Sequence, residues 1–345
     1  MKIELIAFSK NGCSLAERIA TELSAHNHHC ETYRKGNFVA DCQATAVTSS
    51  LHSWTEEAFA AAEALVFVGA VGIAVRAIAP FVANKTQDPA VVVVDEKGNY
   101  AISLLSGHIG GANKLTTTIA AAIGAEAVIT TATDINGKFA VDAFAEERGL
   151  YISNMTRAKE ISAAILARGS VNFQSDFPIN GQLPDGLTYA AEGELGVYIS
   201  STELKKPFHK TLHLIPKTIT VGIGCRKDTP CEQIEELVIK VLRSNELSLH
   251  SVKAVASIDL KKNEEGILQF CKKYELPPSF YTKEELEEVK GDFSESSFVK
   301  NITGIGNVCE RAALKVANEG TLIQKKVAAN SVTVALASEP YQIYF

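Results

Sequence analysis

Short apolar runs and longer segments with helical spacing alternate along the first third of the chain. The apolar runs have the length and β-branched content of strands; they are Ile3 to Ala7, Ala64 to Gly69, Val91 to Val94, Tyr100 to Leu105 and Val128 to Thr131. Helices are predicted between them, over Ser14 to Leu23, from Ser53, over Val71 to Ile78 and over Asn113 to Ile123. This alternation predicts an open, largely parallel sheet with helices on both faces, which binds ligands outside the carboxyl ends of its strands.

The same order of strand, glycine turn and helix returns in the last third. Strands are predicted over Thr218 to Gly222, Val252 to Ser257 and Val332 to Ala337, and helices from Thr229, over Glu264 to Tyr274, from Thr282 and over Asn307 to Ala317. Between these parts, short apolar runs are separated by Pro and Gly turns. We therefore expect an α/β protein in which two α/β sheet domains, residues 1–133 and 217–345, are joined by a smaller α+β middle domain, residues 134–216.

Two helix starts carry capping signals. Ser53 and Glu56 have the spacing of a capping box. Thr229 precedes Pro230 and is followed by Glu232, which predicts an N-cap at Thr229 and Pro230 at the first helical position.

Composition limits the class of protein. The 345 residues are 46% hydrophobic and 21% charged, enough to bury two or three cores. The net charge of -6 argues against nucleic acid and the membrane surface as partners. No apolar run has the length of a membrane span and no signal-peptide pattern is present, so we expect a cytoplasmic protein.

Cysteine and motif usage remove further classes. Seven cysteines occur without a C-x-x-C pair, which favours reduced thiols and predicts no metal site. The P-loop, the G-x-G-x-x-G fingerprint, H-E-x-x-H and G-x-S-x-G are all missing, so nucleotide hydrolysis, dinucleotide redox chemistry and serine-hydrolase chemistry lose support.

A histidine lies in the glycine-rich turn between the strand ending at Leu105 and the helix from Asn113. The unperturbed pKa of a histidine lies near neutrality, so His108 is a candidate general base. Gly110 and Gly111 place backbone N–H groups at the helix start, where an anion can bind. The alternative is a tight turn in which the histidine packs or caps.

Six ordered segments together resemble the cobalt-precorrin-5A hydrolase family of anaerobic cobalamin biosynthesis. They are Val71 to Pro80, Asp88 to Asn113, Val128 to Asp134, Gly222 to Lys227, Ser257 to Glu264 and Thr303 to Glu310. The resemblance implies an enzyme that opens the ring-A δ-lactone of cobalt-precorrin-5A, cleaves a carbon–carbon bond and releases acetaldehyde, giving cobalt-precorrin-5B.

This resemblance suggests roles for individual residues. The expected catalytic residues are His108 as base, with Asp88 or Asp134 orienting the histidine or the water; a turn at Asp88 and a helix cap at Asp134 are the alternatives. The expected substrate-binding residues are Arg76, Lys85, Gly107, Gly110, Gly111, Asn113, Lys114, Thr130, Thr131, Gly224, Cys225, Arg226, Lys227, Lys261 and Glu264. The cations among them suit the carboxylates of the substrate, with surface exposure as the alternative. Cys225 either touches the ring or cobalt or packs as an apolar residue.

No cofactor is expected, because the cobalt belongs to the substrate. The expected partners are the corrinoid itself and, transiently, other corrin-pathway enzymes; the oligomeric state is not predicted. Two other functions stay open: a non-catalytic carrier of corrinoid intermediates, and an unrelated α/β enzyme acting on a small anionic metabolite.

Overall fold

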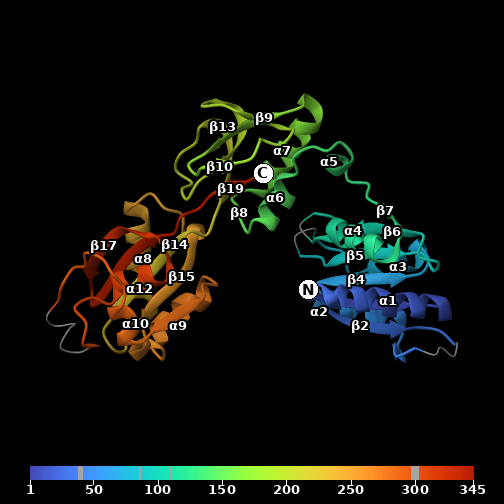
Figure 1. Cartoon of the computed structure of the whole chain (residues 1–345), viewed down its shortest axis with the longest axis horizontal. Coiled ribbons are helices and arrows are strands. Elements are labelled where there is room, and N and C mark those ends of the chain that lie inside the picture. The colour runs from blue at the N-terminus through green and yellow to red at the C-terminus, as the bar shows by residue number, and fades with distance from the viewer. Residues whose placement is uncertain (38–41, 85–86, 109, 297–302) are drawn as a thin grey trace. The chain divides into compact units, whose positions relative to one another are not determined.

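A computed structural model describes the chain except residues 38–41, 85–86, 109 and 297–302, and describes only the backbone of residues 133 and 134. The chain divides into two compact units, Met1–Ala143 (unit 1) and Phe144–Phe345 (unit 2), and each is described by itself (Figure 1). The α/β fold class is confirmed. The domain boundaries expected at residues 133 and 216 stay predictions.

Unit 1 is built on a seven-stranded sheet. Its strands, in spatial order, are β3 (Thr45–Ala46), β2 (His29–Arg34), β1 (Lys2–Ala7), β4 (Ala64–Val68), β5 (Ala90–Val94), β6 (Tyr100–Leu105) and β7 (Glu126–Val128). Neighbouring strands are parallel except β5 and β6, which are antiparallel. The bounds expected for the strand from Val128 to Thr131 are wrong, because β7 ends at Val128.

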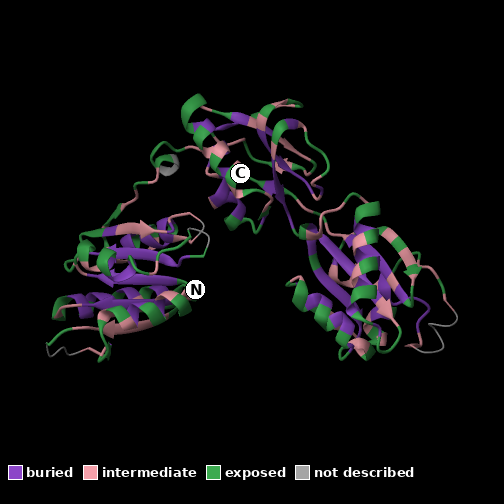
Figure 2. Ribbon diagram, turned by 180° about the vertical axis from the view of Figure 1, so that it is seen from behind, coloured by how far each residue is buried: buried purple, intermediate pink, exposed green. Residues whose placement is uncertain are grey.

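Helices cover both faces of this sheet, as expected. One face carries α1 (Lys10–Ala25) and α4 (Ala112–Ile123), and the other carries α2 (Leu51–Ala61) and α3 (Val71–Ile78). Successive residues of a strand point to opposite faces, so Leu5 packs in the core under α1 and α4 while Ile6 packs under α2 and α3. The central strands β1, β4 and β5 are buried on both sides (Figure 2). Two short helices follow β7: α5 (Ala132–Ile135) in unit 1, and α6 (Val141–Glu147), whose first three residues end unit 1 and whose remaining residues begin unit 2.

The antiparallel β5–β6 pair reverses one expectation. Val91 pairs with Leu105 and Val94 with Ala101, so the carboxyl end of β6 lies beside the amino end of β5. The His108 turn, which follows β6, is therefore at the edge of the sheet where β1, β4 and β5 begin. We expected the carboxyl edge. The hairpin turn between β5 and β6 is too short for a crossover helix, and a short connection makes neighbouring strands antiparallel.

Unit 2 contains two five-stranded sheets and one small two-stranded sheet. The first five-stranded sheet orders β11 (Leu187–Tyr189), β9 (Val171–Ser175), β12 (Gly193–Ile199), β13 (Phe208–Ile215) and β8 (Tyr151–Ile152), and α7 (Met155–Arg168) packs on it. The two-stranded sheet pairs β10 (Ile179–Asn180) with β19 (Ile343–Tyr344).

The second five-stranded sheet of unit 2 carries the candidate site. It orders β16 (Pro278–Tyr281), β15 (Val252–Ile258), β14 (Ile219–Cys225), β18 (Val332–Ser338) and β17 (Thr321–Ala329). Its helices are α8 (Cys231–Ser244), α9 (Glu265–Lys273), α10 (Lys283–Glu287) and α12 (Cys309–Val316). Strands β14, β15 and β16 are parallel, and β17 and β18 are antiparallel to their neighbours.

Both capping predictions need correction. Helix α2 begins at Leu51, and its N-cap is Ser50, whose hydroxyl accepts the N–H of Ser53. Helix α8 has Pro230 as its N-cap, and the Thr229 hydroxyl donates to the Arg226 carbonyl instead of capping. In α2 the cap is thus Ser50 in place of Ser53, and in α8 no side chain of the N-cap residue caps the helix.

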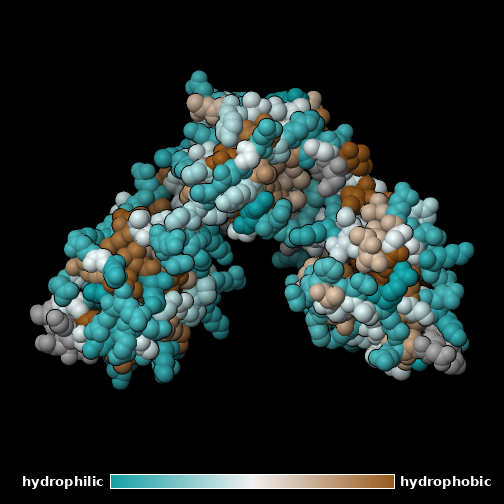
Figure 3. Space-filling view, viewed as in Figure 1, coloured by the Kyte–Doolittle hydropathy of each residue, from teal (hydrophilic) through white to brown (hydrophobic). Residues whose placement is uncertain are grey.

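The surface in Figure 3 mixes hydrophilic and hydrophobic patches on each unit, with hydrophilic residues prevailing in this view. Among the described helices, none combines the length and the apolar character that crossing a membrane requires.

Candidate functional site

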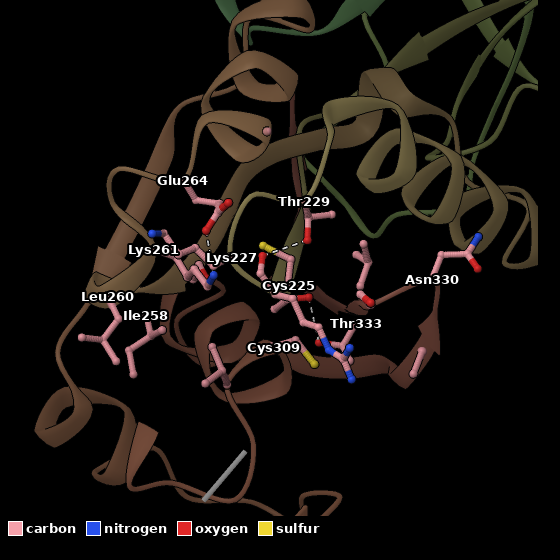
Figure 4. A pocket seen from close by; sticks show the side chains of 18 of the residues that line it. Cys225, Lys227, Thr229, Ile258, Leu260, Lys261, Glu264, Cys309, Asn330 and Thr333 are labelled. Carbon is pink, nitrogen blue, oxygen red and sulfur yellow. Dashed lines mark hydrogen bonds and ion pairs between the residues drawn. The ribbon is translucent and has the colours of Figure 1, made fainter. Parts of the chain in front are cut away.

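A cavity of about 1240 Å³ lies in unit 2 at the carboxyl ends of β14 and β15 (Figure 4). The turn after β14, the segment between β15 and α9, the start of α12 and the β17–β18 turn all contribute to it. Six of the expected substrate-binding residues line this one cavity: Gly224, Cys225, Arg226, Lys227, Lys261 and Glu264. The sequence placed them on separate motifs, and the parallel pairing of β14 with β15 brings the motifs together.

Three helices begin at the cavity wall. Cys231 opens α8, Glu265 opens α9 and Cys309 opens α12, and all three line the cavity. The N–H groups in the first turn of a helix carry partial positive charge and favour anions. The N-cap residues of these helices form no side-chain capping hydrogen bond, although Asn307 Oδ1 accepts the N–H of Glu310 in the first turn of α12. The wall thus offers helix N-termini and four cations to a negatively charged ligand, beside the carboxylates of Asp228, Glu232, Glu264 and Glu265.

Two glycines of β14 allow close packing beneath the cavity. A Cβ on Gly222 would lie 1.8 Å from the carbonyl oxygen of Cys309, and one on Gly224 would lie 2.6 Å from the hydroxyl of Thr333. The Thr333 hydroxyl in turn donates to the Gly224 carbonyl at 3.2 Å. Glycine at these positions lets α12 and β18 approach β14, which fixes the position of Cys225 at the end of the strand.

The cations at the cavity differ in their partners. Lys261 Nζ lies 2.7 Å from Glu264 Oε2, and both side chains are largely buried, so this pair neutralises itself. Lys227 is exposed and Lys326 is half-buried, and neither forms an ion pair within the described part of the chain. Lys227 and Lys326 are therefore placed to meet carboxylates of a ligand, although the Glu310 carboxylate also attracts Lys326. The exposed Arg226 lines the cavity as well, and Lys261 with Glu264 shapes the wall.

The Cys225 thiol faces the cavity (Figure 4). Burial raises its pKa above the ordinary value of a thiol, and this effect outweighs the nearby Lys261 ammonium, which lowers the pKa. A thiol that stays protonated at neutral pH is a poor nucleophile and a poor metal ligand. Cys225 therefore offers a neutral, polarisable surface to a ligand.

Apolar side chains complete the lining. Ile258, Val308 and Val332 are buried in the wall, and Leu260 is 65% exposed. Pockets for drug-sized molecules hold about 300–1,000 Å³, so this cavity suits a larger ligand. Its lining favours a bulky molecule with an apolar face and anionic groups.

The candidate base occupies a second location, in unit 1. The turn from Ser106 to Gly111 joins β6 to α4, as expected, and His108 lies within it. His108 Nδ1 lies 3.1 Å from Asp142 Oδ1. The two side chains are 13% and 10% exposed, so the pair is nearly enclosed. Asp142 belongs to the first turn of α6.

The neighbouring polar residues hold the loops around His108. Both carboxylate oxygens of Asp88 accept the N–H of Ala83, and one also accepts the N–H of Asn84, which matches the turn alternative for Asp88. Asn113 accepts from the Ser103 hydroxyl and donates to the Thr131 hydroxyl. The structure thus brings Asp88, Asn113 and Thr131 to the same edge as His108, in supporting positions.

The helix start beside His108 is less available than expected. Gly111 N–H donates to the His108 carbonyl, and the next two N–H groups donate to Ser106 and Gly107. The N–H of Gly111 is therefore already used within the turn, and anion binding at Gly110 and Gly111 stays a prediction. Gly110 is required for packing, since its Cβ would lie 2.4 Å from the Ser106 Cβ. Gly107 is similarly crowded, by Asn113.

The remaining expected site residues of unit 1 make no described contact with His108. The Arg76 guanidinium donates to the Gly72 carbonyl of its own helix. Lys114 and Thr130 are exposed. Lys85 and the side chain of Asp134 lie outside the described residues.

Asp142 and Lys326 were missed in the sequence analysis. Asp142 is distant from His108 in sequence, and no spacing rule links the two residues. Lys326 lies on β17, a strand that the apolar pattern did not predict, because its burial alternates only between exposed and half-buried positions.

Family models match three successive parts of the chain. "Cobalamin synthesis G N-terminal" covers residues 53–134, "Cobalamin biosynthesis central region" covers 139–216 and "Cobalamin synthesis G C-terminus" covers 219–337. The fold and its cavity thus belong to a protein of cobalamin biosynthesis.

Individual relatives identify the family within cobalamin biosynthesis more closely. The cobalt-precorrin-5A hydrolase of Salmonella typhimurium is 35% identical over 349 residues, covering 97% of this chain and 97% of the relative. That of Priestia megaterium is 30% identical over 356 residues, covering 98% and 95%. A solved structure of a homolog of cobalamin biosynthesis protein G from Sulfolobus solfataricus is 24% identical, with a TM-score of 0.43, over 98% of this chain and 97% of that one. The chain belongs to the cobalt-precorrin-5A hydrolase family and is a hydrolase, which confirms the resemblance found in its sequence motifs.

Proposed function

We propose that this enzyme converts cobalt-precorrin-5A and water to cobalt-precorrin-5B and acetaldehyde. The names of its relatives suggest the substrate, and the cavity in unit 2 supports it most directly. That cavity is large, partly apolar and lined by several cations, which suits a macrocycle bearing several carboxylates. The cobalt enters as part of the substrate, and we propose no resident cofactor.

Water first adds to the lactone carbonyl and the ester C–O bond breaks, which leaves a carboxylate and a hydroxyl group. The hydroxyl then loses its proton to a base. Its oxygen forms the C=O of acetaldehyde while the adjacent C–C bond breaks, and the electron pair of that bond passes into the conjugated macrocycle, which takes up a proton. The reaction therefore needs one base and donors for the oxyanion.

We assign the base to His108. Imidazole exchanges protons near neutral pH, so it suits a step that first accepts and then returns a proton. Its enclosure in the turn between β6 and α4 limits competition from bulk water. We assign carboxylate binding to Lys227 and Lys326, each of which can form charge-assisted hydrogen bonds. A cytoplasmic location and transient contacts with other corrin-pathway enzymes stay predictions.

The test is an anaerobic incubation with cobalt-precorrin-5A in which released acetaldehyde is trapped and quantified. Wild type, His108→Asn and a control, His209→Asn, are compared; His209 is exposed on β13. The expected result is full release by wild type and control, and a loss of about 100-fold or more in His108→Asn.

Other outcomes identify what fails. Equal release by all three proteins would keep the hydrolase and remove His108 as the base. Bound corrinoid without acetaldehyde from the wild type would replace the enzyme by the carrier alternative.

A further inference from the structure

We propose that Asp142 is the positioning residue of His108: its carboxylate fixes the ring in the tautomer that places the basic lone pair on Nε2. The catalytic part of this inference rests on the proposed function. The structural part, a defined tautomer of His108, does not.

The geometry of the pair supports the assignment. The 3.1 Å separation of His108 Nδ1 and Asp142 Oδ1 is a hydrogen-bond distance. A carboxylate accepts hydrogen bonds, so Nδ1 must carry the proton. In a neutral imidazole only one nitrogen is protonated, which leaves the lone pair on Nε2. Because both side chains are nearly enclosed, water competes weakly for either partner.

Both partners lie on fixed backbone. On the histidine side, the His108 carbonyl accepts the Gly111 N–H at 2.8 Å, and Ser106 is tied through its hydroxyl to the Asp88 carbonyl at 3.0 Å. On the aspartate side, Asp142 follows the buried Val141, and its Oδ1 also accepts the N–H of Ala143 at 3.2 Å. These contacts hold the backbone on each side of the pair.

In this proposal Asp142 takes the orienting role that the sequence analysis gave to Asp88 or Asp134; the side chain of Asp134 lies outside the described residues. The Asp88 carboxylate is used by the N–H groups of Ala83 and Asn84. Within the described part of the chain, the carboxylate that forms an ion pair with His108 is that of Asp142.

A carboxylate at Nδ1 serves the proposed reaction in two ways. It keeps Nε2 unprotonated so that the ring can take the hydroxyl proton of the opened lactone. It then stabilises the imidazolium that forms when Nε2 is protonated and the C–C bond breaks, as an aspartate does in hydrolytic triads.

The first measurement is the tautomer itself, by long-range ¹H–¹⁵N NMR of the full chain, with the His108 ring assigned by its loss in His108→Asn. Wild type should show the Nδ1–H form at a pH where the ring is neutral. Asp142→Asn should move His108 toward the Nε2–H form, because the amide NH₂ can donate to Nδ1. Glu147→Gln, an exposed change on the same helix, should leave the spectrum unchanged.

The second measurement is turnover. Asp142→Asn should lower kcat about 100-fold or more with KM within about twofold. Asp142→Glu should recover part of kcat, because it restores a carboxylate. If Asp142→Asn does not fold, the wild-type tautomer and the Asp142→Glu variant still decide the question.

Each result has a distinct meaning. An Nε2–H tautomer in the wild type, or an unchanged spectrum and full kcat in Asp142→Asn, would overturn the inference and leave the proposed function intact. An Nδ1–H tautomer that responds to Asp142→Asn, in a wild type that releases no acetaldehyde, would support the pairing and overturn the proposed function.

Discussion

Gly222 and Cys309 meet through their backbones: a Cβ on Gly222 would lie 1.8 Å from the Cys309 carbonyl oxygen. This contact sets the distance between β14 and the start of α12, both of which line the cavity of unit 2. The shape of the cavity therefore depends on glycine at position 222, because a side chain there would overlap the backbone of Cys309.

We predict that Gly222→Ala destabilises unit 2 by about 3 kcal/mol or more, because backbone must move to relieve the overlap. Far-UV circular dichroism during urea unfolding measures this. The chain has one tryptophan, Trp54 in unit 1, so its fluorescence transition should stay in place. Gly169→Ala is the control: its φ of +90° is strained but nothing lies within 4 Å, so about 1 kcal/mol is expected. An equal effect of both changes would contradict the packing argument.

We predict that Glu310 makes unit 2 sensitive to acid. Its buried carboxylate accepts the N–H of Ser294, the hydroxyl of Ser294 and the N–H of Lys326. Burial alone raises the pKa of Glu310, but these hydrogen bonds outweigh it and hold the pKa below its ordinary value. The carboxylate form is thus the form that the fold stabilises. Its contribution is fully present above the pKa of the unfolded chain and is lost as pH falls through the lower pKa of the folded chain.

Glu310→Gln should therefore cost about 2 kcal/mol or more at neutral pH, since an amide NH₂ faces backbone donors. The difference from wild type should shrink in acid, below the ordinary pKa of a glutamate. Urea unfolding at several pH values measures both. Glu319→Gln, an exposed change beyond the end of α12, should stay within about 0.5 kcal/mol. A difference between Glu310→Gln and wild type that persists unchanged into acid would refute the assignment.

We predict that Lys227→Met and Lys326→Met each raise KM for the corrinoid substrate several-fold, with kcat nearly unchanged. Each removes one charge-assisted contact to a carboxylate, worth about 1 kcal/mol, or about fivefold, at a partly exposed position. Steady-state kinetics at two salt concentrations measure this, and the effect should shrink at high salt. Lys262→Met changes the same charge beside Lys261 but outside the cavity lining, so it should behave as wild type. Equal effects of all three changes would indicate general charge attraction instead of binding in the cavity.

We predict that Cys225 reacts slowly with iodoacetamide at neutral pH. Its raised pKa leaves little thiolate, so labelling should become fast only in alkali. Peptide mass spectrometry identifies the labelled site, and Cys225→Ser serves as the blank. Cys225→Ala should keep kcat within about threefold, because a protonated thiol contributes packing. Rapid labelling at neutral pH, or loss of turnover in Cys225→Ala, would show instead that a thiolate acts in the reaction.

Local sequence signals identified many elements correctly. The apolar runs of unit 1 correspond to β1, β4, β5 and β6, and α3 has the expected bounds. Strands β1, β4 and β5 were predictable because burial on both faces leaves continuous apolar runs. The strands β16 and β17 were not predicted, since β17 has no fully buried residue and β16 is only four residues long.

The sequence by itself determined the α/β class, the family, and which residues form the two glycine-rich turns. Strand and helix periodicity and turn chemistry are local properties, so a sequence pattern is enough to predict them. Only the tertiary structure decided which residues meet. The β5–β6 hairpin placed His108 at the opposite sheet edge from the one expected, and α6 brought Asp142 to its ring. Likewise, parallel pairing of β14 with β15 gathered Lys227 and Lys261 around one cavity, and the β17–β18 hairpin added Lys326. The direction of a strand and the contact of distant side chains arise from long-range packing, which no local pattern encodes.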